Sequence, residues 1–206
     1  MTLVKSIDSF VRWLNENVCN QILLKVPDDD RNDSGYDVEF VNPVAYPLYF
    51  PGKDRLPPKV QSPFPGIAVQ LIEGEDDLLK NNRQLQFRLC IACWNPGTHG
   101  EEVLHTKEDK TAIGGYKYYN KNEKSYERNM QGWRDAFNFA DIIVREIENT
   151  EYIEGHRIIK EKGIKFGVFT EDGNILDYYP YWQKWITVSL ESGLSTKIPE
   201  KYKELL

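Results

Sequence analysis

The sequence is poor in the residues that build most metal and redox centres. Its 206 residues include 3 cysteines and 3 histidines, and no apolar run approaches the ~20 residues that span a bilayer. So few cysteines in a chain of this length do not form a disulfide framework. Asp8, Arg12 and Glu16 interrupt the N-terminal apolar pattern, which therefore lacks the core of a signal peptide. We expect a soluble protein of a reducing cytoplasm.

Excess positive charge is absent as well. Lys and Arg total 26 against 32 Asp and Glu, a net charge of −6. An acidic chain lacks the basic surface that neutralises phosphates, so we expect no tight binding to the outside of DNA or to an anionic membrane. The chain is nevertheless 40% hydrophobic and 13% aromatic, which is enough for a core. Its length predicts a single domain over residues 1–206.

Apolar periodicity predicts two helices and a set of strands. Residues 2–18 and 132–149 repeat apolar side chains at three- and four-residue spacing, and Thr2 is a candidate N-cap for the first helix. In the clearest strand, Phe87, Leu89, Ile91 and Cys93 alternate onto one face. The candidate strands are residues 21–26, 66–72, 85–94, 157–161, 164–170 and 182–190. This order predicts an α+β fold, a mainly antiparallel sheet with two helices packed on one face.

A long proline-rich segment, residues 27–65, separates the first helix from the central strands. Seven prolines follow Asn42, and each fixes φ and removes a backbone donor, so we expect no interior strand or helix. Tyr46, Tyr49 and Phe50 lie among these prolines. This mixture predicts an extended arm that lies on a surface of this chain or of a neighbour, with these aromatic residues as candidate contacts.

A second long segment, residues 98–130, is polar and rich in tyrosine, and we expect a long loop. Its basic and aromatic composition suits either stacking on nucleic acid or a protein interface. The acidic remainder of the chain favours protein, and a loop without a partner remains an alternative. The candidate interface residues are Tyr116, Tyr118, Tyr119, Tyr126 and Arg128.

No motif of the sequence predicts catalysis or metal binding. Cys90 and Cys93 form a C-x-x-C inside a predicted strand, where residues three apart point to opposite faces and cannot share a metal ion. The acidic residues 28–39 resemble a calcium loop, but Asp33 stands where the sharp turn needs glycine. P-loop, G-x-S-x-G and H-E-x-x-H signatures are absent. We therefore expect no catalytic residue, no metal ligand and no cofactor.

A small hydrolase remains the alternative from another class. Catalytic triads assemble from residues that are distant in sequence, so a lone histidine retains this potential. The candidates are His99, His105 and His156.

Short strings at the boundaries of the predicted elements resemble a known family. They are PGIAV at 65–69, CWNPG at 93–97 and QGWRD at 131–135, the last of which opens the second helix. With the order of elements over residues 60–190, this layout resembles the tail terminator and tail-completion (head–tail joining) proteins of long-tailed bacteriophages, including prophages of Gram-positive hosts.

The resemblance implies a structural protein of the virion tail rather than an enzyme. Such proteins form a homo-oligomeric ring, typically a hexamer, that caps the tail tube and joins it to the head. The implied partners are further copies of the chain, the tail tube protein, the head–tail connector protein and DNA that passes through the lumen without specific binding. A ring needs two different patches per subunit, for which the arm and the tyrosine-rich loop are candidates. A head–tail connector or other neck protein is the alternative.

Overall fold

The computed structural model has the predicted α+β fold, and it describes residues 2–27, 39–96, 105–108, 111, 116–119, 132–177 and 180–193. Its helices are α1 (Leu3–Asn17) and α3 (Trp133–Asn149), with short 3₁₀ helices η1 (Cys19–Gln21), η2 (Lys53–Arg55) and η3 (Lys160–Lys162). Its strands are β1 (Leu24–Lys25), β2 (Phe40–Val41), β3 (Val44–Pro47), β4 (Gly66–Asp77), β5 (Asn82–Trp94), β6 (His105–Glu108), β7 (Tyr116–Tyr119), β8 (Tyr152–Ile153), β9 (His156–Ile158), β10 (Lys165–Gly167), β11 (Thr170–Glu171), β12 (Asn174–Ile175) and β13 (Tyr181–Gly193). No helix among the described residues is both long and apolar enough to cross a membrane.

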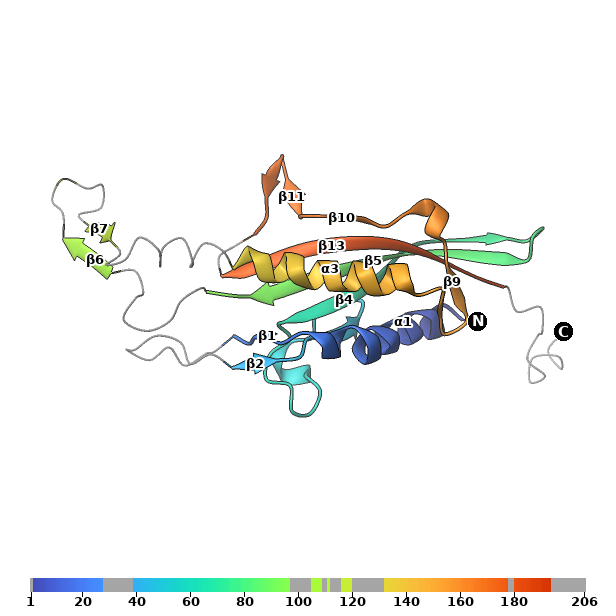
Figure 1. Cartoon of the computed structure of the whole chain (residues 1–206), viewed down its shortest axis with the longest axis horizontal. Coiled ribbons are helices and arrows are strands. Elements are labelled where there is room, and N and C mark those ends of the chain that lie inside the picture. The colour runs from blue at the N-terminus through green and yellow to red at the C-terminus, as the bar shows by residue number, and fades with distance from the viewer. Residues whose placement is uncertain are drawn as a thin grey trace.

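The main sheet is built around three long strands. Its order is β3-β4-β5-β13-β9-β8, and β10 also pairs with β13. Strands β4 and β3 run parallel, whereas every other pair in this sheet is antiparallel. The prediction of a mainly antiparallel sheet is therefore confirmed, and β5 lies at its centre (Figure 1).

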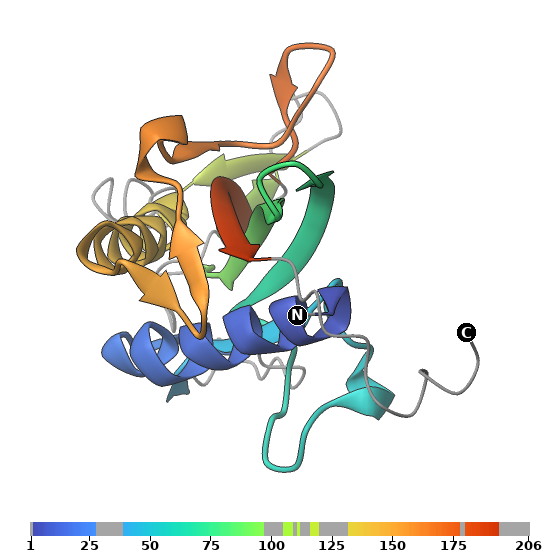
Figure 2. The same ribbon diagram turned by 90° about the vertical axis from the view of Figure 1, so that its right-hand side faces the viewer.

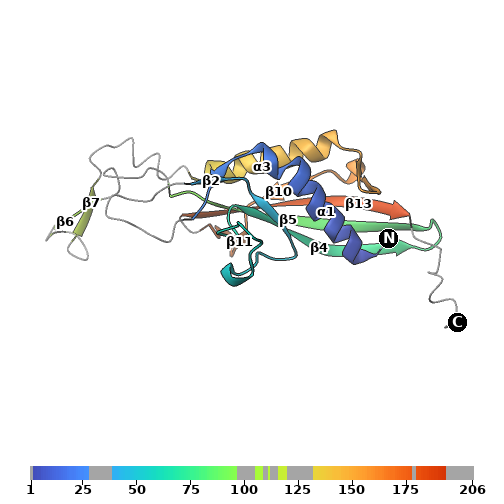
Figure 3. The ribbon, with the colours of Figure 1, turned by 90° about the horizontal axis from the view of Figure 1, so that it is seen from below.

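Both helices pack on the same face of this sheet, as predicted (Figure 2). The predicted apolar face of β5 is fully buried, and Phe87 meets Phe10 of α1 edge to face with ring centroids 5.2 Å apart. Helix α3 contributes Phe139 and Ile143 to the same core. Helix α1 crosses the strands obliquely (Figure 3) and begins at Thr2, whose hydroxyl accepts a hydrogen bond from the Lys5 amide, as its N-cap prediction requires.

The hairpin of β4 and β5 is longer than the sequence predicted. Residues 73–77 are acidic and glycine-containing, a composition typical of a turn, but they continue to pair with β5 beyond a bulge between Leu71 and Glu73. The chain reverses instead at residues 78–81. Strand β13 extends alongside as far as Gly193, so the sheet continues well past the positions where apolar alternation ends.

The proline-rich arm contains regular elements that its prolines obscured. Strand β3 pairs in parallel with residues 66–69 of β4, and η2 forms a single 3₁₀ turn. Because β3 lies at the sheet edge and ends at Pro47, it satisfies the restriction that proline imposes on interior strands. At this point the arm lies on the chain's own sheet.

The polar segment 98–130 contains the β6–β7 pair, in which His105 lies opposite Tyr119, a feature that composition did not predict. The residues that flank the segment approach closely: a Cβ added to Gly132 would lie 2.5 Å from the Asn95 carbonyl oxygen. The Trp182 indole N–H donates to the same oxygen at 3.1 Å. The chain therefore leaves the sheet and returns to α3 at one place.

Candidate functional site

Among the described residues, the most exposed large apolar side chains lie at the end of the β4–β5 hairpin. We call residues 72–77 of β4, 82–84 of β5 and 191–193 of β13 the distal blade, and residues 78–81 the hairpin tip. The hairpin projects past both helices at one end of the molecule (Figure 1). Leu78 and Leu79 of the tip are 81% and 100% exposed. Two adjacent leucines held in solvent are typical of a surface that another molecule covers.

Polar contacts fix the hairpin tip in place. The Arg83 guanidinium donates from Nε and Nη2 to the two carboxylate oxygens of Asp76, both at 2.6 Å. Asp77 Oδ1 accepts from the amides of Leu79 at 3.1 Å and Lys80 at 3.0 Å. The hydrogen bond from Arg83 lowers the pKa of Asp76, and those from Lys80 lower the pKa of Asp77. The leucines are thus presented by a defined turn.

The outer edge of β4 is unpaired along the distal blade. Strand β3 ends at Pro47, opposite Val69 of β4. The next residue, Leu48, donates its amide to the Val69 carbonyl at 2.9 Å and has a positive φ of 65°. From Leu71 to Asp77, no strand among the described residues pairs with this edge. An open edge of this length offers backbone donors and acceptors to another strand.

The opposite side of the sheet carries a basic edge formed by η3 and β10. This edge holds Lys160, Lys162 and Lys165, and the Phe166 ring is 63% exposed. The Ile159 amide donates to the Ser189 carbonyl at 2.9 Å, and Lys162 Nζ donates to Gln84 Oε1 at 2.7 Å, which fixes η3 against the distal blade.

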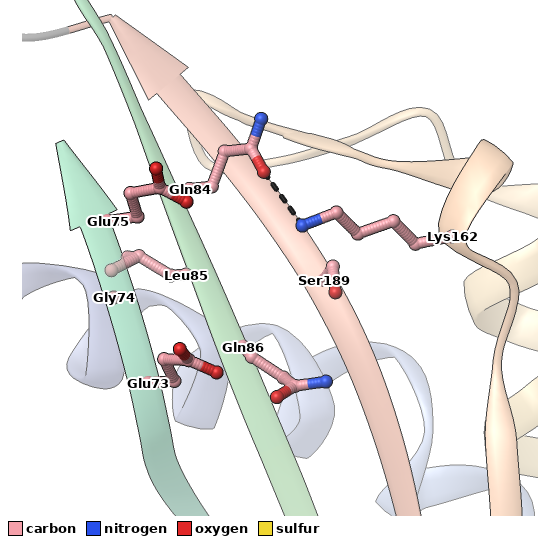
Figure 4. Close-up of a pocket in the computed structure, with 8 residues that line it drawn as sticks. All are labelled: Glu73, Gly74, Glu75, Gln84, Leu85, Gln86, Lys162 and Ser189. Carbon is pink, nitrogen blue, oxygen red and sulfur yellow. Dashed lines mark hydrogen bonds between the residues drawn. The ribbon is translucent and has the colours of Figure 1, made fainter. Parts of the chain in front are cut away.

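A shallow polar depression of about 140 Å³ lies between these two edges (Figure 4). Lys162 reaches over β13 toward Gln84, while Glu73 and Glu75 project from β4 on the same face. Across the strands, Glu73 lies opposite Gln86 and Glu75 opposite Gln84. Among the described residues, no group of three or more His, Cys, Asp or Glu side chains could hold a metal ion. The side chains that line the depression therefore offer charged and hydrogen-bonding groups to a bound molecule.

The aromatic residues predicted in the arm have different environments. Tyr46 is 5% exposed, and burial raises its pKa to about 12, so its ring packs within this chain. It begins a row of ring contacts that continues through Phe50 and Phe64 to Tyr181, with centroids 6.3, 5.1 and 5.6 Å apart. Phe50 is half-buried in this row, whereas Tyr49 is exposed beside the end of β3.

The tyrosine-rich candidates are only partly described. Tyr116, Tyr118 and Tyr119 lie in β7, opposite Glu108, Thr106 and His105 of β6. Tyr126 and Arg128 lie outside the described residues, as do His99 and the acidic residues 28–38. Only the strand pairing of the tyrosine-rich candidates in β7 is described, so their role as interface residues stays a prediction.

The two cysteines of the C-x-x-C motif point to opposite faces of β5, as predicted. Cys93 is buried in the core, where burial raises the pKa of its thiol. Cys90 lies on the other face, and its thiol donates to Gln70 Oε1 at 3.4 Å. Burial also raises the pKa of Cys90, so neither thiol is disposed to form the thiolate that metal binding or exchange requires.

His156 forms a serine–histidine pair that the sequence did not reveal. Its Nε2 lies 2.9 Å from Ser6 Oγ of α1, and its Nδ1 lies 3.2 Å from the Ile153 carbonyl oxygen. Both side chains are 1% exposed, and none of the depressions described on the surface is lined by either. A nucleophile and base enclosed in this way cannot reach a substrate, so this pair joins α1 to the β8–β9 hairpin.

Sequence reasoning missed the hairpin tip and the open edge of β4. The available signal was the pair Leu78–Leu79, which stands between acidic residues and the polar residues 80–84 with no periodicity to explain it. No known protein family, curated protein or solved structure matches this chain.

Proposed function

We propose that this chain is a structural assembly protein, the subunit of a homo-oligomeric ring of the tail-terminator kind that its sequence resembles. In this role it caps the tail tube of a long-tailed bacteriophage and joins it to the head, as a component of the virion tail. The observation that carries the proposal is the hairpin tip, which exposes Leu78 and Leu79 at the end of an ordered blade with an open strand edge.

Burial of the hairpin tip would supply association energy. Covering a leucine side chain contributes roughly 1.5–3 kcal/mol. The turn is already held by Asp77, so little conformational entropy is lost when a partner covers the leucines. A projecting apolar tip also cannot lie against the same tip of a second copy and a different surface at once. Where the tip contacts a different surface of the next copy, the interface is heterologous, and it forms a ring when the rotation between successive copies closes.

The charge of the chain agrees with a ring through which DNA passes. With a net charge of −6, a ring of several copies repels phosphates rather than binding them. DNA would move through such a lumen without specific contacts. The other partners of the role are the tail tube protein on one side of the ring and the head–tail connector protein on the other.

The test is the solution mass by light scattering across protein concentration, with negative-stain imaging of the large species. We expect closed rings, hexameric if the resemblance holds. The variant L78S/L79S should lose them and remain folded. The matched control is L23S, which changes an exposed leucine beside β1, at the other end of the sheet (Figure 1).

A wild-type chain that stays monomeric up to about 1 mM, the weak end of specific association, would overturn the proposal. Rings that bind purified head connectors but never tail tubes would instead assign the chain to the neck.

A further inference from the structure

The geometry points to a contact between the two edges of the main sheet in successive copies of this chain. The open edge of β4, residues 71–77, docks on the η3–β10 edge, residues 160–167, of a second copy. This inference rests on the proposed ring and assigns its subunit interface. The hairpin tip of one copy then lies against Phe166 of the next.

The β4 edge is acidic even when the carboxylates that form ion pairs within the hairpin are left out. Asp76 and Asp77 form ion pairs with Arg83 and Lys80 within the hairpin. Glu73 and Glu75 are exposed and lie on the blade itself. Apolar residues accompany them along the edge, at Ile72 and at the hairpin tip. The edge therefore offers carboxylates, leucines and unpaired backbone groups together.

The η3–β10 edge has the complementary chemistry. This edge carries three lysines, Lys160, Lys162 and Lys165, and one carboxylate, that of Glu161. The Glu161 carboxylate lies 3.7 Å from the Arg157 guanidinium. Phe166 adds an exposed ring beside these lysines. Strand β10 pairs with β13 on one side, and no strand among the described residues pairs with its other side. A basic edge with an apolar ring and free backbone groups matches what the β4 edge presents.

The two edges lie on opposite sides of one subunit, which suits a repeating contact. In the sheet order, β4 precedes β5 and β13, and β10 lies beyond β13 (Figure 2). A contact of the β4 edge with itself would oppose like charges, which is unfavourable. A contact of the acidic edge of one copy with the basic edge of the next pairs opposite charges. The resulting dimer still has one free acidic edge and one free basic edge, so further copies add until a ring closes. Because one chain carries both complementary edges, the partner that fits the open edge of β4 is a second copy of this chain.

Charge exchange between the edges tests the inference. The variants are E73K/E75K on the β4 edge and K160E/K165E on the other. Lys162 is retained because it binds the Gln84 side chain; K160E/K165E removes one internal contact, the hydrogen bond from Lys160 Nζ to the Glu148 carbonyl at 2.8 Å. We expect each variant alone to lose assembly, with at least about tenfold weaker association from the opposed like charges. A mixture of the two variants should recover assembly, because each then offers the edge that the other lacks. A single chain carrying all four substitutions should recover it too.

The matched control is D8K/D141K, which reverses two exposed carboxylates on the outer sides of α1 and α3 and should assemble as the wild type does. If both edge variants assemble normally, this interface is wrong while the proposed ring stands. If each variant is monomeric but neither the mixture nor the fourfold variant recovers, the two edges do not meet, and the β4 edge binds a different protein. A monomeric wild-type chain would overturn the ring and this interface together.

Discussion

The two halves of the β4–β5–β13 sheet share strands but differ in what holds them. In the half beneath the helices, Phe87 and Ile186 are completely buried and contact residues far apart in sequence. In the distal blade, the strands are held by backbone pairing and by polar contacts such as Arg83 with Asp76. Stability is concentrated in the first half, whereas the second half presents a surface. A sheet that continues beyond its core leaves strand edges and apolar residues in solvent, which agrees with the binding role proposed for the extension.

The largest expected effect contrasts one residue of each half. F87A removes a fully buried ring that contacts Phe10, and it should lower the free energy of unfolding by ~3–5 kcal/mol. L79A truncates a completely exposed side chain and should change that free energy by no more than about 0.5 kcal/mol. Urea denaturation of both variants, at a concentration where the protein is monomeric, measures the difference. Equal losses would show that the tip packs into the fold and would remove the distinction between the two halves.

A smaller effect concerns pH and the helix-covered half. Burial lowers the pKa of His156 below its ordinary value of 6.5, while its contact with the Ile153 carbonyl opposes the shift. The unfolded chain therefore takes up this proton first, so the contribution of the neutral ring is present above about pH 6.5 and is lost as the pH falls. The neutral ring can donate from Nδ1 to the Ile153 carbonyl, while Nε2 lies 2.9 Å from Ser6 Oγ, which is itself 3.1 Å from the Thr2 carbonyl oxygen.

The measurement is the melting temperature between pH 7 and pH 5 for the wild type and for H156N. The neighbouring charges are the N-terminal amine, which also lowers the pKa of His156, and Glu154, whose partner Arg12 lies 2.9 Å away; both proteins retain them. We expect a steeper fall in the wild type than in H156N. Parallel curves would show that His156 does not titrate between the folded and unfolded states in this range.

The sequence predicted the helix-covered half well because burial leaves a periodic trace. The stripe of α1 and the alternation of β5 follow directly from apolar spacing. The distal blade has no such trace, since Glu73 and Glu75 face solvent and resemble a turn in composition. Strand β3 was hidden because its parallel pairing with β4 depends on a partner 22 residues away, Val44 with Gly66. The contact of His156 with Ser6, separated by 150 residues, depends on the tertiary fold alone.

The smallest effect is confined to the hairpin tip. Asp77 accepts hydrogen bonds from the amides of Leu79 and Lys80, and these bonds lower its pKa. A depressed carboxyl pKa stabilises the turn above the unfolded value of 3.8, and this support is lost as the pH falls through the folded value. D77A should therefore speed hydrogen exchange at the Leu79 and Lys80 amides at neutral pH. Amide exchange at Phe87 should not change, because no contact of Asp77 reaches the core. Exchange that rises equally at Phe87 would mean that the blade and the helix-covered half unfold as one unit. Changes at the tip would then also destabilise the core.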